Sequence, residues 1–310
     1  MIRLALPLLV LLAAIRCHAE LRWEPLQTEH PLPPGVSVHM GTGLNAAGQP
    51  LRVACALLDR RVAGAPSWQV ASLEQGVLPP PELAASVGDT PSVLVNGGYF
   101  GGKPLRSQSL IVQDGQLRAP GLTQLIRGGH TLYPRRGAFG ERLDGSFSAD
   151  WVFAAGAPPQ LYYTTTLSNP AQAPDAASPH WTMRTAIGGG PLLIKDGHVR
   201  NHADAEVFDA ASGVIPDAPA PRTAIGSTRD GQLILMVVEG RSEASGGVDT
   251  RELAALMQSQ GAVQAVNLDG GGSSAMWVQG RLITRPSDAK GVRAVSSVVL
   301  FGTRSAATPP

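Results

Sequence analysis

Five two-residue turns divide the chain into short apolar segments, and they limit its fold more than any other feature of the sequence. The runs beside them contain β-branched residues and are too short for helices. Asp-Gly supplies the positive φ angles of a two-residue β-hairpin turn. The five turns are Asp114-Gly115, Asp144-Gly145, Asp196-Gly197, Asp230-Gly231 and Gln279-Gly280. We therefore expect antiparallel hairpins to make up much of the protein.

Two segments are predicted to be helical. Asp249 and Glu252 have the spacing of a capping box, apolar residues then recur at helical spacing, and Gly261 ends the pattern. This pattern predicts a helix over residues 250–260, and residues 79–86 start a second, shorter helix. With the hairpins, these helices favour an α+β fold, in which a mixed or antiparallel β-sheet core with a few packed helices forms a single domain.

Three further segments complete the predicted organisation. Residues 20–50 are rich in Pro and Gly and are expected to form an extended lead-in with edge strands. Residues 156–179 shift to Ala, Pro, Thr and Ser, which is typical of a surface loop or an insertion. Residues 305–310 are expected to form a disordered tail, which leaves residues 20–304 as the folded domain.

Residues 1–19 have the pattern of an export signal. A short basic start is followed by an apolar run from Leu4 to Ile15 and by the small residue Ala19 at the expected cleavage site. The apolar run is too short to span a bilayer comfortably, and no later run is long enough for a membrane helix. We expect cleavage near Ala19 and a soluble periplasmic or secreted protein.

Cleavage of this signal changes the charge and the cysteine content of the chain. It removes Arg3 and Arg16, which lowers the formal net charge from +1 to −1 and argues against nucleic acid as the main partner. It also removes one of the two cysteines, so that Cys55 has no partner for an intrachain disulfide. The apolar neighbours of Cys55 predict a buried, inert thiol. The oligomeric state is left open.

Four segments share a pattern in which an apolar strand ends at glycines or a polar residue before another strand begins. They are "VLVNGGYF" (93–100), "TAIGGGPLLIKDG" (185–197), "PRTAIGSTRDG" (221–231) and "AVNLDGGGSSAMW" (265–277). Strand ends allow a rigid scaffold to present backbone donors to one pocket. Each segment alone is equally consistent with a plain tight turn. Neither triple-glycine segment fits a P-loop or a dinucleotide-binding motif, because no Gly-Lys-Ser/Thr and no helix follows.

Taken together, these segments resemble one enzyme family. The stretch "NLDGGGSSAM", preceded by the predicted helix and combined with "PRTAIG", "AIGGGPLL" and "VNGGYF", is similar to the phosphodiester glycosidases, the family of the uncovering enzyme that removes N-acetylglucosamine from mannose 6-phosphate. The resemblance covers residues 90–302. It implies hydrolysis of the sugar C1–O bond of a sugar 1-phosphodiester, with phosphate left on the aglycone and an envelope glycan or glycolipid as substrate.

The resemblance also implies that a carboxylate acts at the sugar carbon. Phosphate is a better leaving group than an alcohol, so strong general-acid help is less necessary than in ordinary glycosidases. Asp269 is the first candidate for the carboxylate and Glu239 is the second. The alternative role of Asp269 is to cap a turn, and that of Glu239 is a strand-end ion pair with Arg241. Which carboxylate is nucleophile, acid or base is left open.

Residues near the glycine segments are candidates to bind the charged substrate. Backbone N–H groups in a glycine loop can surround phosphate oxygens, arginines can bind them bidentately, and short polar side chains can bind phosphate or sugar hydroxyls. The candidates are Asn96, Arg222, Arg241, Gly270, Gly271, Gly272, Ser273, Ser274 and Arg293. The seven histidines show no zinc-like spacing, so we expect neither a metal nor another cofactor.

Two other functions are consistent with the same sequence. The chain could be a non-catalytic envelope or exopolysaccharide-binding protein that has kept the glycine segments. It could also be a phosphodiesterase that cuts the P–O bond, which usually requires a metal. The presence of Asp269, Glu239 and the three arginines argues against the first, and the absence of a His/Asp cluster argues against the second.

Overall fold

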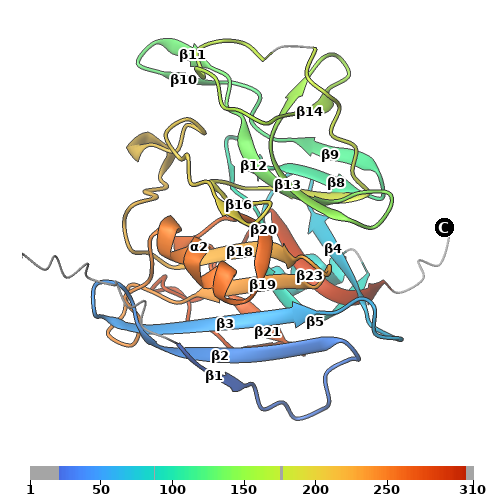
Figure 1. Ribbon diagram of the computed structural model, residues 1–310, viewed down its shortest axis with the longest axis vertical. Coiled ribbons are helices and arrows are strands. Elements are labelled where there is room, and N and C mark those ends of the chain that lie inside the picture. The colour runs from blue at the N-terminus through green and yellow to red at the C-terminus, as the bar shows by residue number, and fades with distance from the viewer. Residues whose placement is uncertain (1–20, 87, 175–176, 305–310) are drawn as a thin grey trace, which may run out of the picture.

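The computed structural model describes residues 21–304 except residue 87 and residues 175–176. The predicted signal peptide and the predicted tail at 305–310 lie outside the described residues. Within them, three main β-sheets surround a shared core, with two α-helices on the outside (Figure 1). The helices are α1 (Pro80–Ser86) and α2 (Thr250–Ser259), and the 3-10 helices are η1 (Ala210–Ser212) and η2 (Gly271–Ser273).

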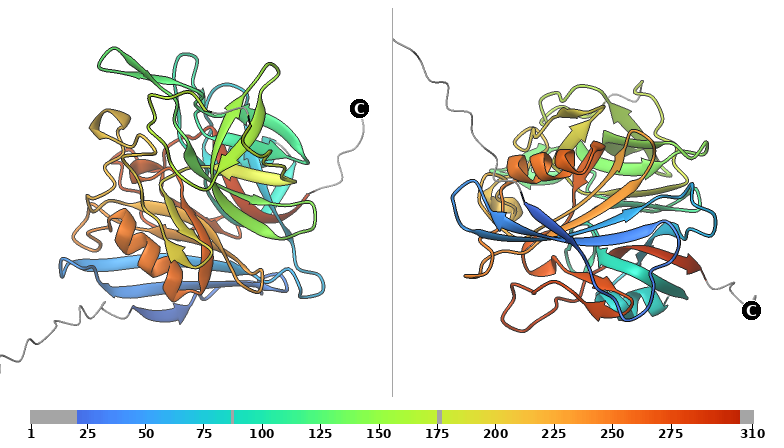
Figure 2. Two further views of the ribbon diagram at one scale, coloured as in Figure 1. Left: turned by 45° about the horizontal axis from the view of Figure 1, so that its top comes forward. Right: turned by 60° about the horizontal axis from the view of Figure 1, so that its bottom comes forward.

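An eight-stranded sheet is the largest element of the fold. Its order is β1 (Arg22–Pro25), β2 (Val36–Leu44), β3 (Pro50–Leu58), β19 (Leu233–Val238), β18 (Arg222–Thr228), β20 (Ala262–Asn267), β16 (Leu192–Lys195) and β17 (His198–Val199). Figure 2 shows α2 lying across the outer face of this sheet, where its buried side chains contact β16, β18 and β20.

Two smaller sheets face the same core. The six-stranded sheet has the order β14 (Gln160–Thr164), β13 (Phe147–Ala155), β12 (Arg136–Glu141), β15 (Thr185–Gly188), β8 (Leu110–Gln113) and β9 (Gln116–Pro120). The five-stranded sheet has the order β22 (Arg281–Leu282), β21 (Met276–Val278), β5 (Asp89–Asn96), β23 (Ser297–Arg304) and β4 (Ser67–Ser72). Two hairpins pair separately, β10 (Leu125–Arg127) with β11 (His130–Leu132) and β6 (Phe100–Gly101) with β7 (Arg106–Ser107).

The core strands are apolar on both faces because both faces are covered. In β19, Leu235 and Val237 face the core shared by the three sheets, whereas Met236 and Val238 pack beneath α2. Successive side chains of a strand point to opposite sides, so a strand with two covered faces needs an unbroken apolar run. All four side chains are fully buried, and each contributes on the order of 2 kcal/mol of hydrophobic stabilisation.

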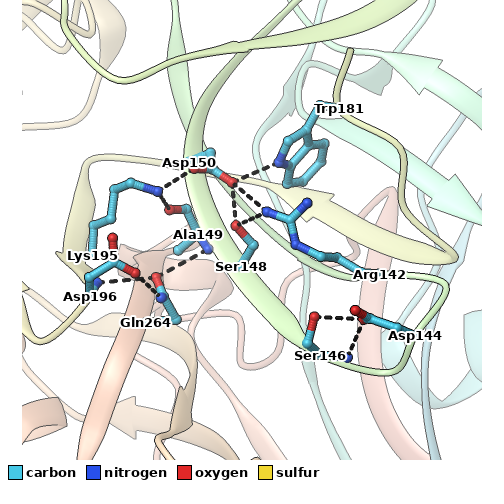
Figure 3. A network of polar contacts seen from close by, with 10 residues as sticks. All are labelled: Arg142, Asp144, Ser146, Ser148, Ala149, Asp150, Trp181, Lys195, Asp196 and Gln264. Atoms are coloured by element: carbon cyan, nitrogen blue, oxygen red, sulfur yellow. Dashed lines mark hydrogen bonds and ion pairs between the residues drawn. The ribbon is translucent and has the colours of Figure 1, made fainter. Parts of the chain in front are cut away.

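A buried polar network joins the six-stranded sheet to the eight-stranded sheet. Asp150 of β13 forms an ion pair with Lys195 of β16 and accepts hydrogen bonds from Ser148 and from the indole N–H of Trp181, the latter at 2.8 Å (Figure 3). The Asp150 side chain is only 1% exposed. Burial alone would raise the pKa of Asp150, but its hydrogen bonds and the Lys195 charge outweigh burial and lower this pKa below its ordinary value.

The local predictions from turn and cap residues are confirmed. All five predicted turns connect paired antiparallel strands, for example Asp114-Gly115 between β8 and β9, where both residues have positive φ angles of 51° and 75°. At the start of α2, the Glu252 N–H donates to the Asp249 carboxylate at 2.7 Å. Cys55 is fully buried, and burial raises the pKa of its thiol to about 12.

The predicted fold class is confirmed in part, since the protein is a single β-rich domain with hairpins and few helices. The protein is a mostly antiparallel β-sheet domain and not an α+β fold, since its two α-helices span only seven and ten residues. Every strand pairing among the described residues is antiparallel, so the mixed-sheet alternative does not apply. Residues 156–179 are also not merely a loop, because β14 lies within them and pairs with β13. Packing against β13 overrides the weak local preference of this Pro-rich and Ala-rich segment.

Candidate active site

The four glycine segments, which are far apart in the sequence, meet around one loop. Residues 268–275 cross from β20 in the eight-stranded sheet to β21 in the five-stranded sheet. The other three segments form backbone hydrogen bonds to this crossing or to Asn267, the residue directly before it. The bonds run from Asp269 N–H to the Gly97 carbonyl at 3.2 Å, from Gly271 N–H to the Pro221 carbonyl at 2.9 Å, and from Gly190 N–H to the Asn267 carbonyl at 2.7 Å. We call residues 268–275 the glycine loop.

Two glycines of the loop are required by close neighbours within the protein. A Cβ atom at Gly270 would lie 2.9 Å from the carbonyl oxygen of Pro221. Gly271 has a positive φ of 59°, and a Cβ atom there would lie 3.2 and 3.3 Å from the two terminal nitrogens of Arg241. The absence of a side chain at Gly271 therefore allows the Arg241 guanidinium to lie directly against the loop.

The third glycine, Gly272, leaves room for the carboxylate of a neighbouring aspartate. A Cβ atom at Gly272 would overlap the carboxylate of Asp288, which packs against the loop backbone. Asp288 in turn pairs with Arg293, whose Nε and Nη2 atoms lie 2.9 and 2.7 Å from the same Asp288 oxygen. An arginine and an arginine–aspartate pair thus flank the loop at successive glycines.

The backbone donors of the loop are mostly used within the protein. The Gly270 N–H donates to the side chain of Asp269 at 2.9 Å, and the Gly271 N–H donates to Pro221. The N–H groups of Ser273 and Ser274 donate back to carbonyls of the loop at 3.2 and 3.1 Å. These bonds shape the loop, so charged side chains are better placed than its backbone to bind a phosphate.

Asp269 has the electrostatic surroundings of a reactive carboxylate. Its side chain is half-buried, and burial raises its pKa to about 6, although the Ser273 hydroxyl, the Gly270 N–H and the Arg293 charge all oppose this rise. Its main chain is held by the Asn96 side-chain amide, which donates to the Asp269 carbonyl at 2.7 Å. A carboxylate with a pKa near neutrality, fixed at a strand end, can act as a nucleophile or as a base.

The three candidate arginines have different surroundings. Arg222 is buried and donates to four backbone carbonyls, including those of Val248 at 3.1 Å and Ala218 at 2.7 Å, which supports the segments beside the loop. Arg293 is paired with Asp288. Among the residues that the structure describes, no carboxylate pairs with Arg241, whose guanidinium lies against Gly271. Arg241 is therefore the arginine best placed to bind an incoming anion.

Glu239, the second candidate carboxylate, belongs to a different set of contacts. It forms an ion pair with Arg52 at 3.3 Å and accepts a hydrogen bond from the Arg285 N–H at 3.1 Å. Its side chain is only 1% exposed. The strand-end ion pair expected for Glu239 exists, but its partner is Arg52 and not Arg241. A catalytic role for Glu239 stays a prediction, which these contacts do not favour.

Two of the three small polar candidates, Asn96 and Ser274, form buried hydrogen bonds with Thr223. The side-chain amide oxygen (Oδ1) of Asn96 accepts from the Thr223 hydroxyl at 2.7 Å, and that hydroxyl lies 3.1 Å from the Ser274 hydroxyl. Ser273 differs, because its buried hydroxyl forms no hydrogen bond of standard geometry within the described part of the chain but lies close enough to the Asp269 carboxylate to lower the pKa of Asp269. We therefore retain Ser273 as the hydroxyl available to a substrate.

Two residues of this region were missed in the sequence. Asp288 lies against Gly272 in the segment that also contains Arg293, and an acidic residue five positions before a candidate arginine is the signal that could have indicated it. The buried hydroxyl of Tyr99 donates to the Gly190 carbonyl at 2.7 Å and accepts from Asn267 at 2.8 Å. Burial and the nearby Asp269 charge raise the pKa of Tyr99 and keep its hydroxyl neutral.

The chain matches the sequence profile of one protein family, described as phosphodiester glycosidase, over residues 89–302. This range includes the whole glycine loop and all four glycine segments. The chain belongs to the phosphodiester glycosidase family. The resemblance expected over residues 90–302 is thereby confirmed, and the family is one of hydrolases.

Individual relatives in this family match in sequence or in fold. Bovine N-acetylglucosamine-1-phosphodiester alpha-N-acetylglucosaminidase is 45% identical over 67 residues, which is 22% of this chain. The matched stretches span only 12–15% of the length of the curated relatives. The auto-inhibited catalytic domain of the zebrafish enzyme of the same name has the same fold, with a TM-score of 0.61 at 20% identity over 93% of this chain and 89% of that chain.

A bacterial protein also has this fold. A protein from Burkholderia pseudomallei K96243 that is described as exported superimposes with a TM-score of 0.64 at 17% identity, over 91% of this chain and 96% of that chain. Within residues 21–304, apart from the undescribed positions, no helix is long and apolar enough to cross a membrane. The same residues include no group of three His, Cys, Asp or Glu side chains arranged to hold a metal ion.

Proposed function

We propose that the protein is an exported glycosidase that hydrolyses the C1–O bond of a sugar 1-phosphodiester. Water adds to the sugar carbon, the bond from that carbon to the phosphate oxygen breaks, and the oxygen leaves with the phosphate. The products are the free sugar and a phosphate monoester on the aglycone. The observation that best supports this reaction is that one loop carries a half-buried carboxylate, Asp269, and is contacted by an arginine that has no carboxylate partner in the described chain, Arg241.

Asp269 is the group that acts at the sugar carbon. Because its pKa is raised to about 6, the carboxylate is ionised at neutral pH but is more basic than an ordinary aspartate. Such a group can attack C1, activate a water molecule, or stabilise the positive charge of an oxocarbenium-like transition state. Asn96 fixes the backbone of Asp269 and Ser273 lies beside its side chain, so the carboxylate is held in one position.

Arg241 is the group that binds the phosphodiester. A guanidinium can bind two phosphate oxygens at once, and this interaction strengthens as negative charge develops on the leaving phosphate. Arg241 lies against Gly271, two residues from Asp269, so a phosphate bound by this guanidinium would lie at the loop that carries the carboxylate. A phosphate monoester leaves as a weak base, so the reaction needs no strong general acid, and the site requires only one reactive carboxylate.

Isotope-labelled water tests the proposed bond cleavage. The protein is incubated with a hexose 1-phosphodiester in ¹⁸O-water, and the products are analysed by ³¹P NMR and mass spectrometry. Label in the sugar hydroxyl and none in the phosphate is the expected result. Label in the phosphate would instead establish cleavage of the P–O bond. Binding of the substrate without turnover would identify a non-catalytic binding protein.

The expected export of the chain indicates where its substrate would be found. A protein with a cleaved signal would meet phosphate-linked sugars in glycans or glycolipids of the cell envelope. The fold shared with a protein described as exported supports this location. N-terminal sequencing of the secreted or periplasmic protein should give a start near Glu20, and a chain that still begins at Met1 would contradict export.

A further inference from the structure

We infer that Asp288 is a positioning residue, which holds the Arg293 guanidinium against the glycine loop that carries Asp269. The inference concerns the site of the proposed function, and its consequence for catalysis rests on that function. The electrostatic effect of Arg293 on Asp269 exists whether or not a sugar phosphodiester is the substrate. It can therefore be tested without any substrate.

The contacts of Asp288 fix its carboxylate on two sides and its backbone through a third contact. Its side chain packs against the backbone of Gly272, where no residue with a Cβ atom would leave room for it. One of its oxygens accepts from both Nε and Nη2 of Arg293, at 2.9 and 2.7 Å. Its own carbonyl accepts from the Gly291 N–H at 2.9 Å, which turns the chain back toward Arg293. Both side chains are partly exposed, at 31% for Asp288 and 42% for Arg293, so the pair is not simply part of the core.

This geometry gives Arg293 a fixed place beside the glycine loop, which also carries the reactive carboxylate. Two donors of one guanidinium bound to one oxygen set the direction of the arginine side chain, which a single contact would not do. The Arg293 charge in turn lowers the pKa of Asp269 against the effect of burial. Without Asp288, the long Arg293 side chain would move into solvent, where its charge is screened.

Several other charged or titratable groups lie near Asp269 and have to be kept constant in a test. Arg241 lies against Gly271, Arg222 passes close to Gly270, and the Tyr99 hydroxyl is affected by the Asp269 charge. Removing the charge of Asp288 therefore has two possible effects of opposite sign. Loss of a nearby negative charge alone would lower the pKa of Asp269, whereas release of Arg293 would raise it.

The decisive experiment is a carboxyl-carbon NMR titration of the whole protein labelled with ¹³C-aspartate. The Asp269 signal is assigned by its loss in Asp269→Asn. We expect Asp288→Asn, a nearly isosteric change, to move the Asp269 titration midpoint upward by about 1 pH unit. A midpoint that stays constant or moves downward would overturn the positioning role.

Two matched variants separate the positioning effect from a change of charge. Gly272→Ala displaces the Asp288 carboxylate without removing any charge, so it should move the midpoint upward as well, and it also serves if Asp288→Asn does not fold. Arg293→Met should give the full upward shift, and adding Asp288→Asn to it should give no further rise. A further rise in that double variant would contradict the inference, because Asp288 would then act independently of Arg293.

Kinetic measurements link the same effect to turnover. If the proposed function is correct, the pH dependence of kcat/KM for a hexose 1-phosphodiester has an acidic limb. The midpoint of this limb should move to higher pH in Asp288→Asn, as the NMR midpoint does. Failure of the wild-type protein to cleave any sugar phosphodiester would refute the proposed function but would leave the NMR result intact.

Discussion

Asp150 and Asp269 are both carboxylates removed from bulk water, but their surroundings are opposite. Asp150 lies between two sheets with Lys195 as ion-pair partner and with Ser148 and Trp181 as hydrogen-bond donors (Figure 3). Asp269 accepts a backbone hydrogen bond from Gly270 and has no ion-pair partner within the described chain. Accordingly, the pKa of Asp150 lies below its ordinary value, whereas that of Asp269 is raised to about 6.

The difference separates a structural carboxylate from a reactive one. At Asp150, every charge is compensated, and the network fixes two sheets relative to each other. At Asp269, the fold leaves a charge only partly compensated and places an arginine without a carboxylate partner, Arg241, against the same loop. Uncompensated charge destabilises the folded chain, so it is expected where function requires it.

The largest expected effect is on catalysis and comes from Asp269→Asn. The change keeps the shape of the side chain but removes the charge that acts at the sugar carbon, so kcat for a hexose 1-phosphodiester should fall by roughly 1,000-fold or more. The melting temperature should stay the same or rise, because an ionised carboxylate with a raised pKa disfavours the folded state. Steady-state kinetics and calorimetry check both results. A fully active variant would show that Asp269 only caps a turn.

Lys195→Met is the matched change in the structural network. It leaves the Asp150 carboxylate buried without its ammonium partner, so the free energy of unfolding should fall by about 3–5 kcal/mol. The activity of the remaining folded protein should be unchanged, since the network contains none of the proposed site residues. Urea unfolding and activity per folded molecule measure the two effects. A clear loss of activity per folded molecule, in addition to the loss of stability, would mean that the two regions are coupled.

A comparison of two arginines gives the next largest effect. Arg241→Lys loses the planar fork, so kcat/KM should fall by about 10- to 100-fold with little change in stability. Arg222→Lys loses several bonds to backbone carbonyls, so it should lower the free energy of unfolding by about 2 kcal/mol and affect substrate binding only secondarily. Measuring kcat/KM and the free energy of unfolding in urea for both variants tests these two expectations. The reverse pattern would identify Arg222 as the phosphate ligand.

The smallest expected effect is the pH dependence of stability. The pKa of Asp269 is higher in the folded than in the unfolded chain, so its contribution to stability is lost as pH rises from about 4 to about 6. The pKa of Asp150 is lower in the folded chain, so its contribution is present at neutral pH and is lost as the pH falls into the acidic range. Unfolding free energies measured from pH 4 to 8 should therefore decline less in Asp269→Asn than in the wild type. A wild-type profile unaltered by this substitution would contradict the raised pKa.

Local features of the fold could be predicted because their causes are local. Each of the five turns consists of residues that accept the required φ angles, as Asp114-Gly115 does, and Asp249 caps α2 through a residue only three positions away. The fold class was less predictable. Apolar patterns do not indicate how many sheets form, because this depends on surfaces contributed by distant strands. They also do not indicate β14, because it lies in a Pro-rich and Ala-rich segment whose composition does not favour a strand, and it forms by pairing with the preceding strand β13.

The sequence by itself determined the hairpins, the helix α2, the family and the glycine loop with Asp269 in it. Only the tertiary structure decided what surrounds that loop. It placed Arg241 against Gly271 and Asp288 against Gly272, while it directed Arg222 to backbone carbonyls and Glu239 to Arg52. The physical reason is that a side chain's charge state and availability depend on burial and on partners brought in by other strands, and neither is encoded in the residues next to it.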